Sequence, residues 1–156
     1  SPPGPPPSPF EVRRVETPTD AASMADVFAE AHGYDRALID ELYGRRLETE
    51  DGFSAWLAWE GDVPVSFTIV TRSAESLALW DVMTPEGHRR RGAARAVISH
   101  ALAEVASAAD APITETFFWA TPLGRPLYEA MGFAIADDID AWTLGASPED
   151  LAAVGA

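Results

Sequence analysis

Apolar residues recur along this chain at two spacings, and each spacing predicts a different kind of secondary structure. Short apolar or alternating runs predict strands, whereas apolar residues that return every three or four positions predict helices. The first pattern predicts strands at residues 10–15, 53–59, 63–70, 77–83, 113–121 and 138–144. The second predicts helices at residues 21–31 and 36–47, a long helix from residue 91 or 92 to 108–110, and a short helix at 126–131.

Local signals refine three of these elements. The segment Glu60-Gly61-Asp62 predicts an antiparallel hairpin between its two flanking strands. In the helix at 36–47 we expect the inward residues to be Leu38, Ile39, Leu42 and Tyr43. In the short helix we expect Pro126 in the first turn, Gly132 as the stop and Phe133 as the start of a strand, with inward residues Leu127, Tyr128 and Met131.

Residues 77–96 organise the chain, because they read as a buried strand, a basic turn and a helix that starts at a glycine. The first backbone N–H groups of such a helix have no intrahelical partner and carry the positive end of the helix dipole. The turn and the first helical turn also hold Arg89, Arg90, Arg91 and Arg95. The stretch therefore predicts a phosphate-binding site. A solvated basic turn at a helix start is the other interpretation.

Composition limits the class of protein. The 156 residues suit one domain, 47% are hydrophobic, and there is no cysteine for disulfide or thiolate chemistry. The net charge of −14 argues against nucleic acid as a partner, while an acidic cleft would attract a cationic acceptor. Solubility alone also explains the charge. No apolar run is long enough to span a membrane, so we expect a cytoplasmic protein and no membrane partner.

Two short motifs carry a family resemblance. Arg89-x-x-Gly92-x-Ala94 resembles the R/Q-x-x-G-x-G/A loop of the GNAT superfamily of acyl-CoA N-acyltransferases, and Tyr128-x-x-x-Gly132-Phe133 resembles a late segment of the same family. The resemblance implies an α/β, three-layer fold with a mixed, mostly antiparallel central sheet flanked by helices. The domain is expected at residues 10–145, before a C-terminal tail at 146–156. Residues 1–9 include six prolines, and this composition predicts a linker or disordered segment.

The same resemblance implies acetyl-CoA as the acyl donor and no metal. Its pyrophosphate would lie on the basic loop, and its pantetheine arm would enter between residues 81–84 and 119–121. Thr121 stands where the family often has asparagine, which weakens the match there. The implied cofactor-binding residues are Val82, Met83, Thr84, Arg89, Arg90, Arg91, Gly92, Ala93, Ala94, Arg95 and Thr121.

Acyl transfer to an amine needs a base for the amine proton, a donor for the oxyanion and an acid for the thiolate. Tyr128 matches the family tyrosine and is the candidate acid; a core tyrosine is its other interpretation. Asp81 and Glu115 are candidate bases, because each is a carboxylate within a predicted strand. Either could instead lie on an exposed edge or pair with an arginine, with water relaying the proton. A backbone N–H near Met83 is the candidate oxyanion donor.

These observations predict an acetyl-CoA-dependent N-acetyltransferase that transfers an acetyl group directly to an amine in a ternary complex. Candidate acceptors are an amine-bearing small molecule, a protein N-terminus or a lysine. The family arrangement would bring His32, Tyr34, Asp35 and Tyr43 near the acceptor site; surface polar residues around a helix break are the other interpretation. A homodimer, or tethering to another domain through the proline-rich segment, stays open. Two alternatives are a non-catalytic acyl-CoA-binding regulatory module and a domain whose basic loop binds an acidic protein.

Overall fold

The computed structural model describes residues 8–44, 46–47 and 50–137. The chain divides into two compact units, Ser1–Phe118 and Trp119–Ala156. The strand predicted at 138–144, the tail at 146–156 and most of the segment at 1–9 lie outside the described residues.

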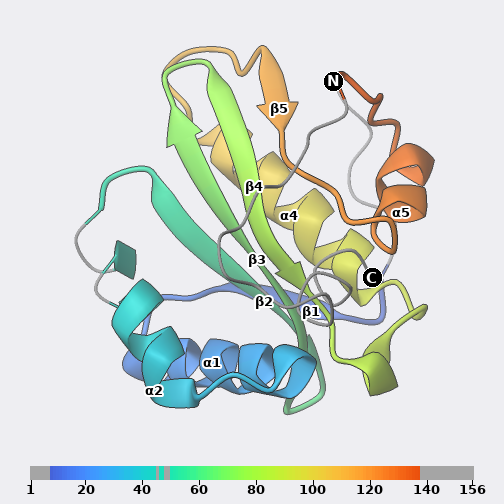
Figure 1. Ribbon diagram of the computed structural model, residues 1–156. Helices are drawn as coiled ribbons and strands as arrows, with labels where there is room; N and C mark the ends of the chain where they lie inside the picture. The colour runs from blue at the N-terminus through green and yellow to red at the C-terminus, as the bar shows by residue number, and fades with distance from the viewer. Residues whose placement is uncertain (1–7, 45, 48–49, 138–156) are drawn as a thin grey trace, which may run out of the picture. The chain divides into compact units, whose positions relative to one another are not determined.

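The first unit is built on one five-stranded sheet in the order β1-β2-β3-β4-β5 (Figure 1). Neighbouring strands from β1 to β4 are antiparallel, and β5 pairs with β4 in parallel. The strands are β1 (Glu11–Arg14), β2 (Phe53–Glu60), β3 (Val63–Ser73), β4 (Ser76–Met83) and β5 (Glu115–Phe117). The predicted hairpin is confirmed, because Glu60 pairs with Val63 across a two-residue turn.

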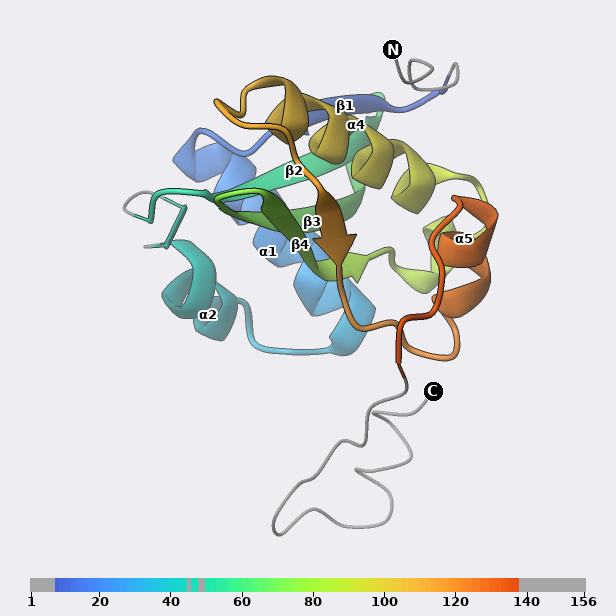
Figure 2. The ribbon, with the colours of Figure 1, turned by 90° about the horizontal axis from the view of Figure 1, so that it is seen from above.

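Helices cover both faces of this sheet. In Figures 1 and 2, α1 (Pro18–His32) and α2 (Arg36–Ile39) lie on one side and α4 (Ala93–Ser107) lies on the other. On β2, Ala55 and Leu57 belong to the apolar cluster that includes Phe28 of α1. Trp56 lies on the opposite face, where its indole N–H donates to Glu104 of α4 over 3.4 Å. The predicted fold, a mixed and mostly antiparallel sheet between helical layers, is confirmed.

Helix α1 begins three residues earlier than the apolar pattern indicates. Thr17 caps it, because the Thr17 hydroxyl accepts from the backbone N–H of Asp20 and the Asp20 carboxylate accepts from that of Thr17. Such a capping box satisfies two N–H groups that would otherwise lack partners. Pro18 fits the first turn, where its missing donor costs nothing.

The second predicted helix differs in form and in the residues it buries. It is a short α2 followed by a π-helical turn, η1, at Asp40–Gly44. Ile39 is buried and Tyr43 is half-buried, but Leu38 and Leu42 are 44% and 48% exposed, so their predicted inward position is wrong. Adjacent residues on a helix point about 100° apart, and of the four predicted inward residues Ile39 and Tyr43 are the two that pack in the core.

The second unit contains α5 (Arg125–Ala130), with Pro126 in its first turn as predicted. Its end is a Schellman motif: Phe133 N–H donates to the carbonyl of Tyr128, and Gly132 N–H donates to that of Glu129. Gly132 has φ 93°, and Phe133 packs edge-on against Tyr128 at 6.3 Å between ring centroids. The Tyr-x-x-x-Gly-Phe segment is thus a helix stop with its customary apolar contact. Phe133 begins no strand, so that prediction is wrong.

Candidate active site

Strand β4 loses its partner on one side halfway along its length. Its pairing with β5 joins Ser76 to Glu115 and ends at Ala78 and Phe117, whereas its pairing with β3 continues to Met83. Strand β5 is three residues long, much shorter than the run predicted at 113–121. Among the described strands, the last five residues of β4 therefore have an unpaired edge on the β5 side. Such an edge can hydrogen-bond an extended ligand.

A β-bulge lies within the unpaired half of β4. Phe67 and Ile69 of β3 pair with Met83 and Trp80, so Asp81 and Val82 together oppose one residue. Asp81 adopts a left-handed conformation with φ 45°, which is costly for a residue with a side chain. Left-handed strain at non-glycine residues is often found at functional sites. The bulge changes the direction of the Asp81 side chain relative to a regular strand.

Ser66 of β3 fixes the end of β4. Its buried hydroxyl donates to the carbonyl of Met83 over 2.8 Å and lies 2.8 Å from the hydroxyl of Thr84. A serine has one hydroxyl hydrogen, which is used on Met83, so Thr84 is the donor in the second contact. Ser66 thereby anchors the junction between β4 and the loop that follows.

The loop that joins β4 to α4 has an irregular backbone. After the single turn η2 (Glu86–His88), the backbone is left-handed at Arg90 (φ 60°) and at Gly92 (φ 92°). Residues of this kind gather N–H donors into a concave anion site. Gly92 caps α4, no side chain caps it, and the space beside Gly92 is open. The predicted start of this helix is confirmed, and its geometry fits a phosphate group.

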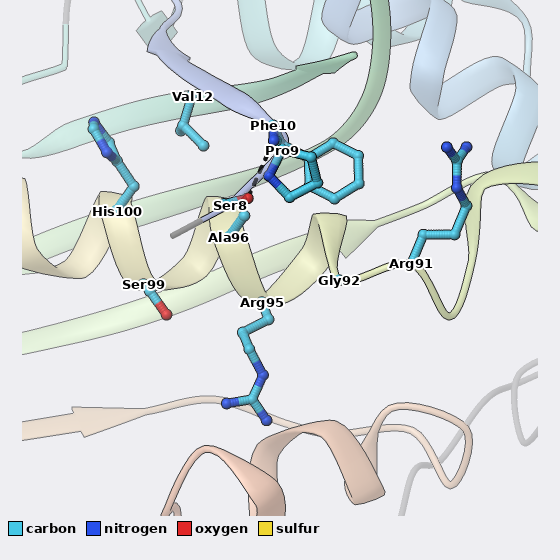
Figure 3. Close-up of a pocket in the computed structure, with 10 residues that line it drawn as sticks. All are labelled: Ser8, Pro9, Phe10, Val12, Arg91, Gly92, Arg95, Ala96, Ser99 and His100. Atoms are coloured by element: carbon cyan, nitrogen blue, oxygen red, sulfur yellow. Dashed lines mark hydrogen bonds between the residues drawn. The ribbon is translucent and has the colours of Figure 1, made fainter. Parts of the chain in front are cut away.

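The four arginines of the loop have different surroundings. Arg89 donates from Nε to the carbonyl of Thr84 over 3.0 Å, which closes the loop on itself. Arg91 forms an ion pair with Glu60 at the end of β2. Figure 3 shows Arg91 and Arg95 leaving the start of α4 in different directions. Arg90 is exposed. The basic cluster therefore does not converge on one point.

A pocket of about 330 Å³ follows the flank of α4 beyond this loop (Figure 3). Residues of β1 and the segment before it form one wall, and the first turns of α4 form the other. No residue of β4 lines it, so it is separate from the bulge. The lining residues are Ser8, Pro9, Phe10, Val12, Arg91, Gly92, Arg95, Ala96, Ser99 and His100.

Tyr43 of η1 reaches the bulge from the α1 side of the sheet. Its hydroxyl donates to Oδ2 of Asp81 over 2.5 Å. Burial, the hydrogen bond to Asp81 and the charge of Asp81 together raise the pKa of Tyr43 well above its usual value, although Arg46 opposes this. The phenol therefore stays protonated at physiological pH. Its ring lies between those of Phe28 and Phe53, with centroids 6.0 and 6.5 Å away.

The other predicted base, Glu115, lies at the opposite end of β4. It is exposed, pairs with Ser76 and accepts from the Ser76 hydroxyl over 2.7 Å. Asp81 lies five positions after Ser76 along the strand, which is about 16 Å at the rise of an extended chain. The structure therefore separates the two carboxylates, and Asp81 is the one that lies beside the loop.

Tyr128 and Thr121 belong to the second unit. Tyr128 is buried, and burial raises its pKa to about 12, so its phenol is protonated at neutral pH. The Thr121 hydroxyl accepts from the backbone N–H of Gly124, and the Thr121 carbonyl accepts from Gly124 and Arg125. These contacts order the turn before α5. The assigned roles of both residues stay predictions.

Sequence reasoning missed Ser66 and did not assign Tyr43 a role in the chemistry. Ser66 lies in the apolar run VPVSFTIV, where one serine in a predicted buried strand was the available signal. Tyr43 lies in a segment with no motif, 38 residues from its partner Asp81. Only the fold brings the side chains of Tyr43 and Asp81 together.

Comparisons with known proteins agree with this geometry. In fold, the chain is similar to an acetyltransferase from Trypanosoma brucei, with a TM-score of 0.67 and 16% identity over 86% of this chain and 99% of that one. It is also similar to an aminoglycoside N-acetyltransferase solved in complex with CoA, with a TM-score of 0.71 and 13% identity over 88% and 95%. A third is glucosamine-6-phosphate N-acetyltransferase from Arabidopsis thaliana, with a TM-score of 0.67 and 11% identity over 88% and 99%.

These likenesses define the class as an acetyltransferase fold. The profile of the acetyltransferase (GNAT) family matches residues 19–133, which is most of the chain, so the protein belongs to the GNAT acetyltransferase family. No curated protein matches its sequence. Within the part of the chain that the structure describes, no helix is long and apolar enough to cross a membrane.

Proposed function

We propose that this protein is an acetyl-CoA-dependent N-acetyltransferase that transfers an acetyl group directly to an amine within a ternary complex. One observation carries the proposal. The unpaired half of β4, with Asp81 on its bulge, is followed by a loop with left-handed backbone at Arg90 and Gly92 and by a helix start that no side chain caps. An acyl donor with an extended arm and a pyrophosphate fits this arrangement, with the arm along the strand edge and the pyrophosphate at the helix start.

The residues present fit acetyl-CoA. The backbone N–H groups of Gly92, Ala93 and Ala94 would hold its pyrophosphate, because no side chain blocks the space beside Gly92. The edge of β4 from Val82 to Thr84 would hold the pantetheine arm. When bound, acetyl-CoA supplies an acetyl group already activated as a thioester.

The side chains and backbone of the protein transfer the protons of the reaction and stabilise the charge that develops. Asp81 accepts the proton that the acceptor amine loses, and Tyr128 donates the proton that the leaving sulfur needs. A backbone N–H near Met83 stabilises the oxygen that gains charge. Replacing Tyr128 by Phe tests the acid role: the rate constant should fall while acetyl-CoA affinity stays unchanged. An unchanged rate constant would remove Tyr128 from the mechanism.

The acceptor is an amine on a small molecule, a protein N-terminus or a lysine side chain. The net charge of −14 supports a cationic acceptor, because an acidic protein attracts cations. Two proteins of similar fold are an aminoglycoside N-acetyltransferase and a glucosamine-6-phosphate N-acetyltransferase. An acceptor screen by thiol release should therefore start with amino sugars and continue with peptides.

The first experiment is a titration with acetyl-CoA, followed by calorimetry and by melting temperature. Ligand at about 100 times its dissociation constant should add about 2.7 kcal/mol, a melting shift of roughly 5–10 °C. Gly92→Glu should abolish the shift by placing a carboxylate where the pyrophosphate binds. The matched control is Gly33→Glu, because Gly33 also has a positive φ and open space beside it but caps the end of α1.

The results separate the candidate functions. Equal binding by wild type and Gly92→Glu would refute the loop assignment. Binding without thiol release for any acceptor would favour a non-catalytic acyl-CoA-binding module. No binding by the wild type would leave neither function standing.

A further inference from the structure

The hydrogen bond between Tyr43 and Asp81 joins the helical segment after α1 to the strand whose edge would hold the acyl donor. One partner lies on the π-helical turn η1 and the other on the bulge of β4. π-Helical turns are rare and are frequent at functional sites. The contact therefore connects the helical segment on the α1 side with the proposed base.

The position of the Tyr43 hydroxyl is fixed from several directions. The Tyr43 ring contacts those of Phe28 and Phe53, and Phe28 in turn stacks on Phe67 of β3. The guanidinium of Arg46 lies 4.4 Å from the ring centroid of Phe53. An exposed phenol would exchange its donor bond with water, but this one is held against a single acceptor.

Asp81, which accepts this hydrogen bond, has a backbone conformation that needs support from its surroundings. Asp81 has φ 45°, and such strain persists only where surrounding contacts determine it. Tyr43 contacts Oδ2, and no other described residue hydrogen-bonds the Asp81 carboxylate. Oδ1 is thus the carboxylate oxygen that can receive a proton from the substrate amine.

We propose that Tyr43 is a positioning residue for the reaction: its hydroxyl holds Asp81 in the bulge and stabilises the carboxylate in its ionised form, with Oδ1 directed to the acceptor. The inference rests on the proposed function, in which Asp81 is the base. A hydrogen bond to a charged group favours the charged form.

Among the described residues, Arg46 is the charged group besides Asp81 that acts on the Tyr43 hydroxyl. Arg46 interacts with Tyr43 and is itself paired with Glu50 through bonds of 2.7 and 3.1 Å. His32 lies beyond the Phe28 ring, 5.8 Å from it between ring centroids. Variation of Tyr43 should therefore act mainly through Asp81.

The test is the pH profile of kcat/KM for Tyr43→Phe, measured by thiol release with the acceptor found in the screen. The acidic limb should move to higher pH by about one unit, because the ionised carboxylate loses its donor. Activity should then fall about tenfold below the limb and recover above it. A merely structural role would lower activity equally at all pH values, and either that result or an unchanged profile overturns the proposal.

Two further variants make the result decisive. Incorporating 3-fluorotyrosine at position 43 keeps the shape but gives a more acidic and stronger donor, so the limb should move to lower pH. In the Asp81→Asn background, Tyr43→Phe should cause no further loss, because it acts through Asp81. Full activity of Asp81→Asn alone would instead refute the proposed base, whereas an inactive Asp81→Asn with an unshifted Tyr43→Phe profile would refute only the role of Tyr43.

Discussion

Each half of β4 takes part in a hydrogen bond between a hydroxyl and a carboxylate. At the start of the strand, Ser76 donates to Glu115 over 2.7 Å; on the bulge, Tyr43 donates to Asp81 over 2.5 Å. The first pair lies where β4 has neighbours on both sides, and Glu115 is exposed. The second lies where one neighbour has ended, the backbone is left-handed and the phosphate-type loop begins.

The comparison shows why a hydrogen-bonded carboxylate is not by itself a site. Two surface groups in a regular ladder contribute little to stability and have no space for a ligand between the strands. At the bulge, the Asp81 carboxylate lies on a strand with an unpaired edge and is held by the Tyr43 hydroxyl. The functional half of β4 is the half in which regular pairing is interrupted.

The strongest test of this comparison removes each carboxylate in turn. Asp81→Asn should lower kcat/KM by about 10²- to 10⁴-fold, the usual contribution of a general base, while asparagine still tolerates the left-handed backbone. Glu115→Gln, the matched change in the other half, should stay within about twofold of wild type. Initial rates of thiol release measure both. Equal effects of the two substitutions would remove the distinction between the halves.

A smaller effect should follow from loosening the end of the strand. Ser66→Ala removes the donor to the Met83 carbonyl and the partner of Thr84, so acetyl-CoA should bind about three- to tenfold more weakly. Ser54→Ala is the control, because Ser54 is also buried and donates to a strand carbonyl, that of Val70, over 3.3 Å. Calorimetric titration of both variants checks the expectation. Equal affinities would mean that Ser66 only supports folding.

The smallest effect concerns backbone strain. Asp81→Gly should be about 1 kcal/mol more stable than Asp81→Ala, because glycine adopts a positive φ without steric cost. Ala74→Gly at the turn before β4, where φ is 43°, should gain a similar amount and leaves the bulge unchanged. Urea unfolding of the variants gives the difference. If Asp81→Ala matched Asp81→Gly, the left-handed conformation at Asp81 would not be a source of strain.

Much of the fold could be predicted because its signals are local. The hairpin turn at Gly61, the helix start at Gly92 and the helix stop at Gly132 each depend on residues a few positions apart. The apolar pattern located four of the five strands closely, but it could not show that β5 pairs over only three residues. It also failed at Leu38 and Leu42, because periodicity does not reveal which of two adjacent stripes meets the core.

The sequence by itself determined the order of the elements, the loop that precedes α4 and the family to which the chain belongs. Only the tertiary structure decided the bulge at Asp81, its bond from Tyr43 and the pairing of Arg91 with Glu60. The partners in these bonds are 38 and 31 residues apart. A donor loop made of backbone groups leaves a short motif, whereas a site made of side chains from separate elements exists only after the strands have paired and the helices have packed.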